Sequence, residues 1–454
     1  MPIIEDSLPN IKSFLEPCIA RSYVRQMIIR FMISILIRHG KNSCMNAASV
    51  IDGKSLHRAQ TTRFLVRCRT AIANVLGKVV THLLSKEDWE GRYLLIIDST
   101  MIGHQGSTAE NTYSTGNRKR RPAKNRRYKK TKYATRSCHC FVFGLLISPE
   151  GTRIPTHLPY YTKSYAKAKK QKHRTQAQLA ARIINDFPIP EGVEVVVLGD
   201  TAFDAKIVRQ SCQMRGYHWI TPINANRVMA GRRGTRRRVS KRIQELSEER
   251  FQMIRIHPNS GRYSNQRRLS EHRAGSKKSK RTYYVHSEKS EVHSVGTVML
   301  VFSSTNPIKG KAKRDSTKLL MTNALHLSPR QVVEIYGMRW QIELFFKELK
   351  STLGMHQYQL KRFEAVESWI DLVVLTFCYL EWTRSRKLTD RRIRAEDRKR
   401  WQHQRCYGLR EAVLLGIQIR QHRWIQKRLN SEHGRKTLVK TYTALLSREY
   451  RCAA

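Results

Sequence analysis

Two apolar runs constrain the fold of this chain more than any other feature. Residues 92–98 read RYLLIID and residues 193–200 read VEVVVLGD. Nearly continuous apolar runs of this length are typical of strands buried on both faces, which occur in sheets covered by helices on both sides. The two runs therefore predict an α/β fold with these strands at its centre.

The segments around these runs alternate between strand and helix patterns. In chain order we predict strands at 140–148 and 152–158, a helix at 175–186, a helix at 202–215 and a strand at 217–223. The order of three strands, helix, strand, helix and strand predicts an RNase H-like core.

The charge of the chain indicates its partner. With 86 Lys and Arg against 35 Asp and Glu, the formal net charge is +51, and a polyanion would offset the self-repulsion of such a body. Residues 118–136 hold eleven basic residues and residues 227–242 hold eight, in both cases without an acid. Such runs are usually solvated loops, but several of them in one chain favour nucleic acid as the partner, with a membrane surface as the weaker alternative.

We divide the chain into five segments. They are a helical N-terminal DNA-binding region (1–90), the first part of the RNase H-like core (91–224), a basic β-rich insertion (225–325), core helices (326–380) and a basic helical C-terminal region (381–454). Within the first segment, small residues, a glycine turn and a polar helix over 47–65 fit a helix-turn-helix and an ordinary helical hairpin about equally well.

The sequence favours neither a membrane span nor a zinc site. The apolar runs 27–37 and 370–380 are too short for a bilayer and each contains a charge, so both predict buried core helices. The N-terminus lacks the basic and apolar regions of a signal peptide, so we expect a cytoplasmic protein. Of nine cysteines only Cys138 and Cys140 are close in sequence, and free thiols are the expectation.

Each apolar run ends in an aspartate, Asp98 in the first and Asp200 in the second. Binding sites in open α/β sheets form at the carboxyl ends of strands. A single aspartate after a strand is more often a cap or turn residue. Two on neighbouring strands predict a shared Mg²⁺ site, because this ion prefers oxygen ligands. Asp204, which falls inside the next predicted helix, is the second-ranked candidate for the position of Asp200.

Residues 335–354 predict one helix with two distinct faces. At about 100° per residue, Tyr336, Arg339, Glu343 and Lys350 fall in one stripe about 60° wide, which we call the helix stripe. The adjacent face is apolar and holds Met338, Ile342, Phe345, Leu349 and Leu353. A surface ion pair between Arg339 and Glu343, worth about 0.2–0.5 kcal/mol, is the simpler interpretation, but it leaves the tyrosine and the lysine unexplained.

The helix stripe resembles the Tyr-Arg-Glu-Lys signature of bacterial DDE transposases of the insertion-sequence-four type, with every spacing matched. Asp-Ser-Thr at 98–100 resembles the first aspartate motif of that family, and Gly-Asp-Thr-Ala-Phe-Asp at 199–204 resembles its second. The resemblance covers about residues 90–380, and the long separation of the second and third acids fits a β-rich insertion into the RNase H-like fold.

This resemblance implies a DNA transposase in which Asp98, Asp200 and Glu343 hold two Mg²⁺ ions, with Mn²⁺ as a substitute. The implied reaction is phosphodiester cleavage at transposon ends followed by strand transfer into target DNA. Tyr336, Arg339 and Lys350 would bind DNA near the cleaved end. The implied partners are double-stranded DNA and a second copy of the chain in a synaptic dimer, at the bacterial nucleoid in the cytoplasm.

Three other functions fit parts of the sequence. An RNase H-like nuclease without strand transfer would share the carboxylates but not the helix stripe. A non-catalytic DNA-binding relative would have no need of all three acids. An RNA-binding protein would explain the charge, but the sequence lacks the aromatic motif of common RNA-binding modules.

Overall fold

The structure is a computed structural model of the chain that describes residues 9–19, 21–37, 58–104, 109–114, 137–224, 226–230, 235–256, 281–313, 316–390, 394–402, 404–439 and 443. Internal contacts divide the chain into two compact units. The helical unit comprises Met1–Val79, Ser351–Tyr358 and Glu364–Ala454, and the sheet unit comprises Val80–Lys350 and Gln359–Phe363.

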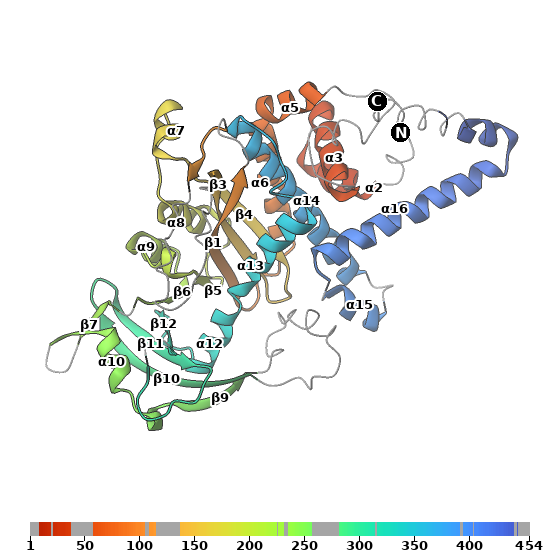
Figure 1. Cartoon of the computed structure of the whole chain (residues 1–454). Coiled ribbons are helices and arrows are strands. Elements are labelled where there is room, and N and C mark those ends of the chain that lie inside the picture. The colour runs from red at the N-terminus through yellow and green to blue at the C-terminus, as the bar shows by residue number, and fades with distance from the viewer. Residues whose placement is uncertain are drawn as a thin grey trace, which may run out of the picture. The chain divides into compact units, whose positions relative to one another are not determined.

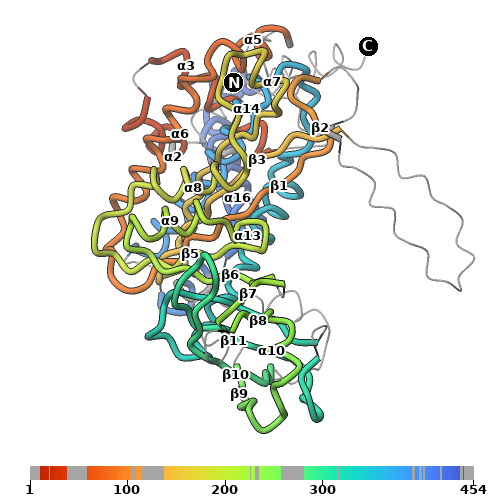
Figure 2. Tube along the Cα trace, turned by 90° about the vertical axis from the view of Figure 1, so that its left-hand side faces the viewer, coloured from red at the N-terminus to blue at the C-terminus, as the bar shows by residue number. Residues whose placement is uncertain are grey.

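The described strands of the sheet unit form a single sheet of twelve strands (Figure 1 and Figure 2). The main path is β2-β3-β1-β5-β6-β12-β11-β10-β7-β8, with β4 paired to β3 and β9 paired to β10. The strands are β1 Tyr93–His104, β2 Tyr113–Ser114, β3 Ser137–Ile147, β4 Arg153–Pro159, β5 Val195–Leu198, β6 His218–Pro222, β7 Val228–Ala230, β8 Arg236–Arg238, β9 Gln252–Ile256, β10 Arg281–Val292, β11 Gly296–Ser304 and β12 Lys318–Thr322.

The two apolar runs lie side by side at the centre of this sheet, where β1 and β5 pair in parallel. Helices cover both faces. On β3, the backbone of Gly144 faces Ile183 of α8 (Gln176–Asp186), and the ring of its neighbour Phe143 packs against Phe345 of α13 (Trp340–Lys347). Figure 1 shows α8 and α13 on opposite sides of the sheet. Burial on both faces is the physical reason for the unbroken apolar sequences.

The predicted elements of the core are confirmed. The helix predicted at 175–186 is α8, which Thr175 caps with a complete capping box. The helix predicted at 202–215 is a short 3₁₀ turn, η2 (Thr201–Phe203), followed by α9 (Lys206–Met214). The other helical elements of the unit are α7 Lys163–Ala168, α10 Val239–Glu245, η4 Glu248–Arg250, α12 Pro329–Gly337 and the first three residues of η6 Glu348–Thr352.

The segment predicted as a β-rich insertion extends the core sheet. β12 pairs antiparallel with β6, where Leu320 lies opposite Pro222, and β11 and β10 continue the sheet beyond it. The chain leaves the core at the end of β6 and returns at the start of β12 next to it. The basic run 118–136 lies outside the described residues.

The helical unit is built around aromatic side chains. Phe14 of α2 (Pro9–Leu15) packs on Tyr379 of α14 (Phe363–Thr389), and Phe31 of α3 (Ser22–Ile37) packs on Trp369 of α14. The apolar runs predicted as buried helices are the cores of α3 and α14. The remaining helices are η1 Glu16–Cys18, α5 Arg58–Arg67, α6 Arg69–Leu84, α15 Ala395–Gln402 and α16 Cys406–Leu429.

Two predictions about this unit have separate outcomes. Residues 47–57 of the possible helix-turn-helix lie outside the described residues, so the choice between the two interpretations of 47–65 stays open. None of the described helices is both long and apolar enough to cross a bilayer.

Candidate active site

Asp98 lies on β1, and Asp200 lies in the loop after the neighbouring strand β5. The last parallel pair joins Ile96 and Leu198, each two residues before its aspartate, and the charge of Asp200 acts on Asp98. The sequence analysis predicted that the first strand ends at Asp98, and this is wrong. β1 continues to His104, because the residues after Asp98 keep pairing with β3. The Asp98 side chain is consequently 17% exposed.

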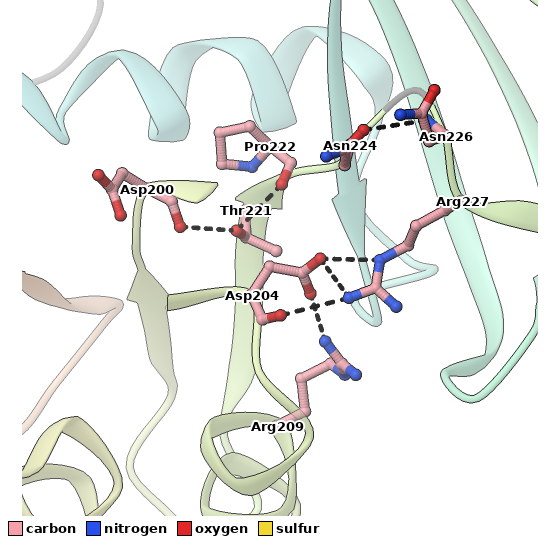
Figure 3. A network of polar contacts seen from close by, with 8 residues as sticks. All are labelled: Asp200, Asp204, Arg209, Thr221, Pro222, Asn224, Asn226 and Arg227. Carbon is pink, nitrogen blue, oxygen red and sulfur yellow. Dashed lines mark hydrogen bonds and ion pairs between the residues drawn. The ribbon is translucent and has the colours of Figure 1, made fainter. Parts of the chain in front are cut away.

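The loop that carries Asp200 is held by short hydrogen-bonded contacts. The Asp200 carboxylate accepts a hydrogen bond from the Ala202 backbone N–H at 2.9 Å and so caps the 3₁₀ turn η2. The Thr221 hydroxyl of β6 donates to the Asp200 backbone oxygen at 3.3 Å (Figure 3). These contacts fix both the carboxylate and the backbone of Asp200 at the carboxyl edge of the sheet.

The predicted single helix at 335–354 is wrong in its continuity. α12 ends at Gly337, α13 begins at Trp340, and the π-helix η6 starts at Glu348. Between α12 and α13 the backbone tightens, since Arg339 N–H donates to the oxygen of Tyr336, three residues back. Residues three apart eclipse in such a turn. The side chains of Tyr336 and Arg339 therefore line up more closely than an ideal α-helix would place them.

Arg339 bridges two of the three predicted catalytic acids. Its guanidinium lies 3.4 Å from an Asp98 carboxylate oxygen and also forms a close ion pair with Glu343 of α13. The side chains of Arg339 and Glu343 are 18% and 32% exposed. The i,i+4 ion pair between Arg339 and Glu343 that the sequence suggested is present. The same guanidinium also pairs with Asp98 on β1, so it links α13 to that strand.

The electrostatics of Asp98 show that the three acids share one field. Burial, together with the charges of Asp200 and Glu343, raises the pKa of the Asp98 carboxyl from 3.8 to about 6, although the Ser99 backbone N–H and Arg339 oppose the shift. Burial is the largest cause of the shift, and the charge of Arg339 does not offset burial together with the two neighbouring carboxylates.

The two remaining residues of the helix stripe differ in exposure. Tyr336 is only 6% exposed, so it is not presented on an open surface as the stripe predicted. Burial raises the pKa of Tyr336 to about 12, with Asp200 and Asp98 adding to the shift and Arg339 opposing it. Lys350 is half-buried and donates to the Met101 backbone oxygen of β1 at 3.1 Å. Both lie in the same unit as the acids.

Asp204, the alternative to Asp200, has a different environment. Its side chain is 4% exposed and is held between Arg209 of α9 and Arg227, which precedes β7 (Figure 3). Arg227 donates to the Asp204 carboxylate at 2.5 and 2.9 Å and to its backbone oxygen at 3.2 Å. Two arginines already satisfy this carboxylate, so Asp204 joins α9 to the start of the insertion. A cavity of about 390 Å³ lies beside it.

Sequence reasoning missed one residue of the cluster. The Lys318 ammonium at the start of β12 lies over the ring of Tyr336, 4.6 Å from its centroid. The sequence predicted only that Lys318 belongs to the basic β-rich insertion at 225–325. Its position beside Tyr336 depends on the antiparallel pairing of β12 with β6, which the sequence did not reveal.

The donor set at this edge fits a divalent metal by its chemistry. Three carboxylates share one electrostatic field, and oxygen ligands of this kind suit Mg²⁺ and Mn²⁺. Within the described ranges, no three His, Cys, Asp or Glu side chains are already gathered as a metal-binding group. Arg339 lies between Asp98 and Glu343, so a metal bound by all three acids requires this guanidinium to move aside.

Within the described part of the chain, the cysteines gather no competing metal centre. All seven described cysteines are free thiols. Cys138 and Cys140 of β3 lie close to Tyr113, and burial raises the pKa of both thiols. Between them, His139 makes a 2.9 Å hydrogen bond with the Glu110 backbone oxygen. These contacts agree with the expectation of buried free thiols.

The comparisons with known proteins bear on the same region. A family model described as a transposase DDE domain matches residues 89–379. This stretch contains the two apolar strands, all three candidate acids and the whole helix stripe. No curated protein matches the chain.

Proposed function

Because this chain belongs to the family of proteins with a transposase DDE domain, we propose that it cleaves DNA at transposon ends and joins those ends to target DNA by a cut-and-paste route. The observation that supports this most directly is the grouping of the three acids: Asp98 and Asp200 follow the parallel pair of Ile96 and Leu198, the charges of Asp200 and Glu343 act on Asp98, and Arg339 links Asp98 to Glu343. The insertion-sequence-four type is part of the proposal, and the spacing of the helix stripe is its support.

The three acids would hold the divalent metals. When bound, Mg²⁺ or Mn²⁺ supplies a polarised water or 3′-hydroxyl for attack on a phosphodiester and stabilises the leaving oxygen. The chain itself positions the three carboxylates. β1 and the Thr221-anchored loop fix two of the ligands, and α13 delivers Glu343. Because the attacking group is a water or a 3′-hydroxyl, the proposed reaction needs no covalent link between protein and DNA.

The basic residues of the helix stripe would hold the DNA. Arg339 presents a planar guanidinium suited to phosphate oxygens, and Lys350 lies beside β1 at Met101, three residues beyond Asp98. Tyr336 is buried and would act from beneath them. On entry of DNA and metal, Arg339 would exchange its carboxylate partners for phosphate. The net charge of +51 supplies the wider attraction to the duplex. The proposal also includes a dimeric synapse and action at the nucleoid.

Cleavage of a duplex that carries the DNA flanking the coding region tests this function. With Mg²⁺ present, we expect the wild type to nick the element boundary and to join the new end to a second duplex. Asp200→Ala and Glu343→Ala should bind the duplex but lose cleavage by on the order of 10³-fold or more. The matched control is Asp186→Ala, since Asp186 is exposed at the end of α8 and pairs only with Arg182 among the described residues.

Each other outcome has a distinct meaning. Cleavage without joining would leave the nuclease interpretation. Binding without cleavage by the wild type would leave the non-catalytic one. Unchanged cleavage by both acid variants would show that these carboxylates are structural and would overturn the site.

A further inference from the structure

We propose that Lys318 is an additional DNA-contacting residue of this site, placed by the ring of Tyr336 to bind a backbone phosphate beside Glu343. The proposal rests on the proposed DNA cleavage function and adds a residue that lies outside the helix stripe.

The sheet topology places Lys318 at the edge that carries the acids. β5 and β6 run parallel, so their carboxyl ends lie at one edge, just before Asp200 in the case of β5. β12 runs antiparallel to β6, with Leu320 opposite Pro222. The amino end of β12, where Lys318 stands, must therefore lie at that same edge. Any change in the register of β12 would move the lysine away from the site.

The contacts of Lys318 point into the cluster. Its ammonium lies over the Tyr336 ring, 4.6 Å from the centroid, a favourable cation–π arrangement. Partial burial and then the charge of Arg339 lower the pKa of Lys318, whereas Glu343 raises it. The lysine is thus within electrostatic reach of the arginine and of the glutamate that Arg339 holds, while it keeps exposed surface of its own.

In the described part of the chain, Lys318 has no carboxylate of its own. Among the residues that the structure describes, no carboxylate lies within ion-pair distance of its ammonium, and Glu343 is already paired with Arg339. The Lys318 ammonium is stabilised by the face of Tyr336 but repelled by the nearby charge of Arg339. An added anion beside it would therefore be stabilising. At the edge of a site that cuts phosphodiesters, the anion of matching chemistry is a DNA phosphate.

The salt dependence of DNA binding tests this contact. Binding to the flanking-end duplex is measured without divalent metal over a series of salt concentrations, so that no cleavage occurs. Lys318→Ala should weaken binding several-fold and reduce the slope of log K against log salt by about 0.9, the value for one lost phosphate contact. Lys318→Arg should restore the slope.

Lys289→Ala is the matched control. Lys289 is also an exposed lysine of this sheet, but β10 runs in the same direction as β12 and Lys289 lies near its carboxyl end, away from the acids. This variant should keep the wild-type slope. A loss of slope in Lys289→Ala equal to that of Lys318→Ala would reduce the effect to general charge and overturn the proposal.

A purely structural lysine gives a different result. If Lys318 only covers Tyr336, then Lys318→Ala lowers the melting temperature and leaves the slope unchanged, which overturns the contact. The slope is independent of catalysis. A wild type that binds the duplex but fails to cut it with Mg²⁺ therefore defeats the proposed function, whereas an unchanged slope in an active enzyme defeats the Lys318 contact alone.

Discussion

Asp200 and Asp204 are only four residues apart in sequence, yet the charges around them are balanced in opposite ways. Around Asp98, Asp200 and Glu343, three carboxylates share one bridging arginine. Around Asp204, one carboxylate is held by two arginines and is almost wholly buried. The first cluster has excess negative charge at an accessible edge, and the second has its acid fully paired inside the unit.

This difference separates a site that can bind a cation from a site that holds structure together. Carboxylates in excess of their cationic partners repel one another, so such a group gains from an added cation. A buried carboxylate between two guanidinium groups gains nothing from one, because its lone pairs are already used. The partners of Asp200 and Asp204, which come from elsewhere in the sequence, therefore favour Asp200 as the ligand of the proposed metal site.

The largest expected effect is on stability, at the fully paired cluster. Asp204→Ala leaves Arg209 and Arg227 without their shared partner and should lower the free energy of unfolding by about 3–5 kcal/mol. Asp200→Ala should change it by less than about 1 kcal/mol, because its carboxylate is only partly buried. Urea denaturation of both variants measures the two values. Equal losses would contradict the contrast between the clusters.

Removing the bridging guanidinium should expose the excess charge of the other cluster. Without metal, Arg339→Gln removes the cation that pairs with both Asp98 and Glu343, leaving Lys318 as the nearest described cation, and should cost about 2 kcal/mol of stability. Added Mg²⁺ should then raise the melting temperature of the variant more than that of the wild type. A smaller rise in the variant would show that Arg339 does not compete with metal for these acids.

The pH dependence of stability should carry a signature of Asp98. Its pKa is raised from 3.8 to about 6 on folding, so between these values the folded state holds the proton more tightly than the unfolded state. Without metal, the free energy of unfolding should fall by up to about 3 kcal/mol as the pH rises through this window. Asp98→Asn should remove that fall. A pH profile identical to that of wild type would contradict the shared field of the three acids.

The smallest expected effect concerns the anchor of the Asp200 loop. Thr221→Val removes the hydroxyl that donates to the Asp200 backbone oxygen, and should cost about 0.5–1.5 kcal/mol. It should also weaken Mg²⁺ binding a few-fold, read from the metal concentration needed to raise the melting temperature. Thr156→Val on β4 is a control for the loss of a threonine hydroxyl away from this loop.

Much of the fold followed from local sequence patterns. The apolar runs predicted the parallel strands β1 and β5, and the pattern at 175–186 predicted α8, where the capping box is complete. Local patterns could not foresee that β1 continues past Asp98, because that extension depends on pairing with β3. Nor could an ideal helical wheel show the tight turn at Arg339 or the π-helix after α13.

The candidate site was predictable only in part. Spacing along one segment selected the helix stripe, and the two apolar runs selected Asp98 and Asp200. The contacts that set the charge balance of the site join distant parts of the chain. Arg227, beyond β6, pairs with Asp204, and Lys318 of β12 lies over the ring of Tyr336 on α12. Such partners are set by tertiary structure, so periodicity and motif spacing do not identify them.

The pairing of β6 with β12 has a consequence for the evolution and engineering of this protein. Strand hydrogen bonds clamp the two stems of the inserted segment together at Pro222 and Leu320. Closing a longer loop between fixed stems costs only about 0.6 kcal/mol per doubling of its length. The segment can therefore lengthen, shrink or be exchanged for a foreign module over generations, while the acids at the neighbouring edge keep their places.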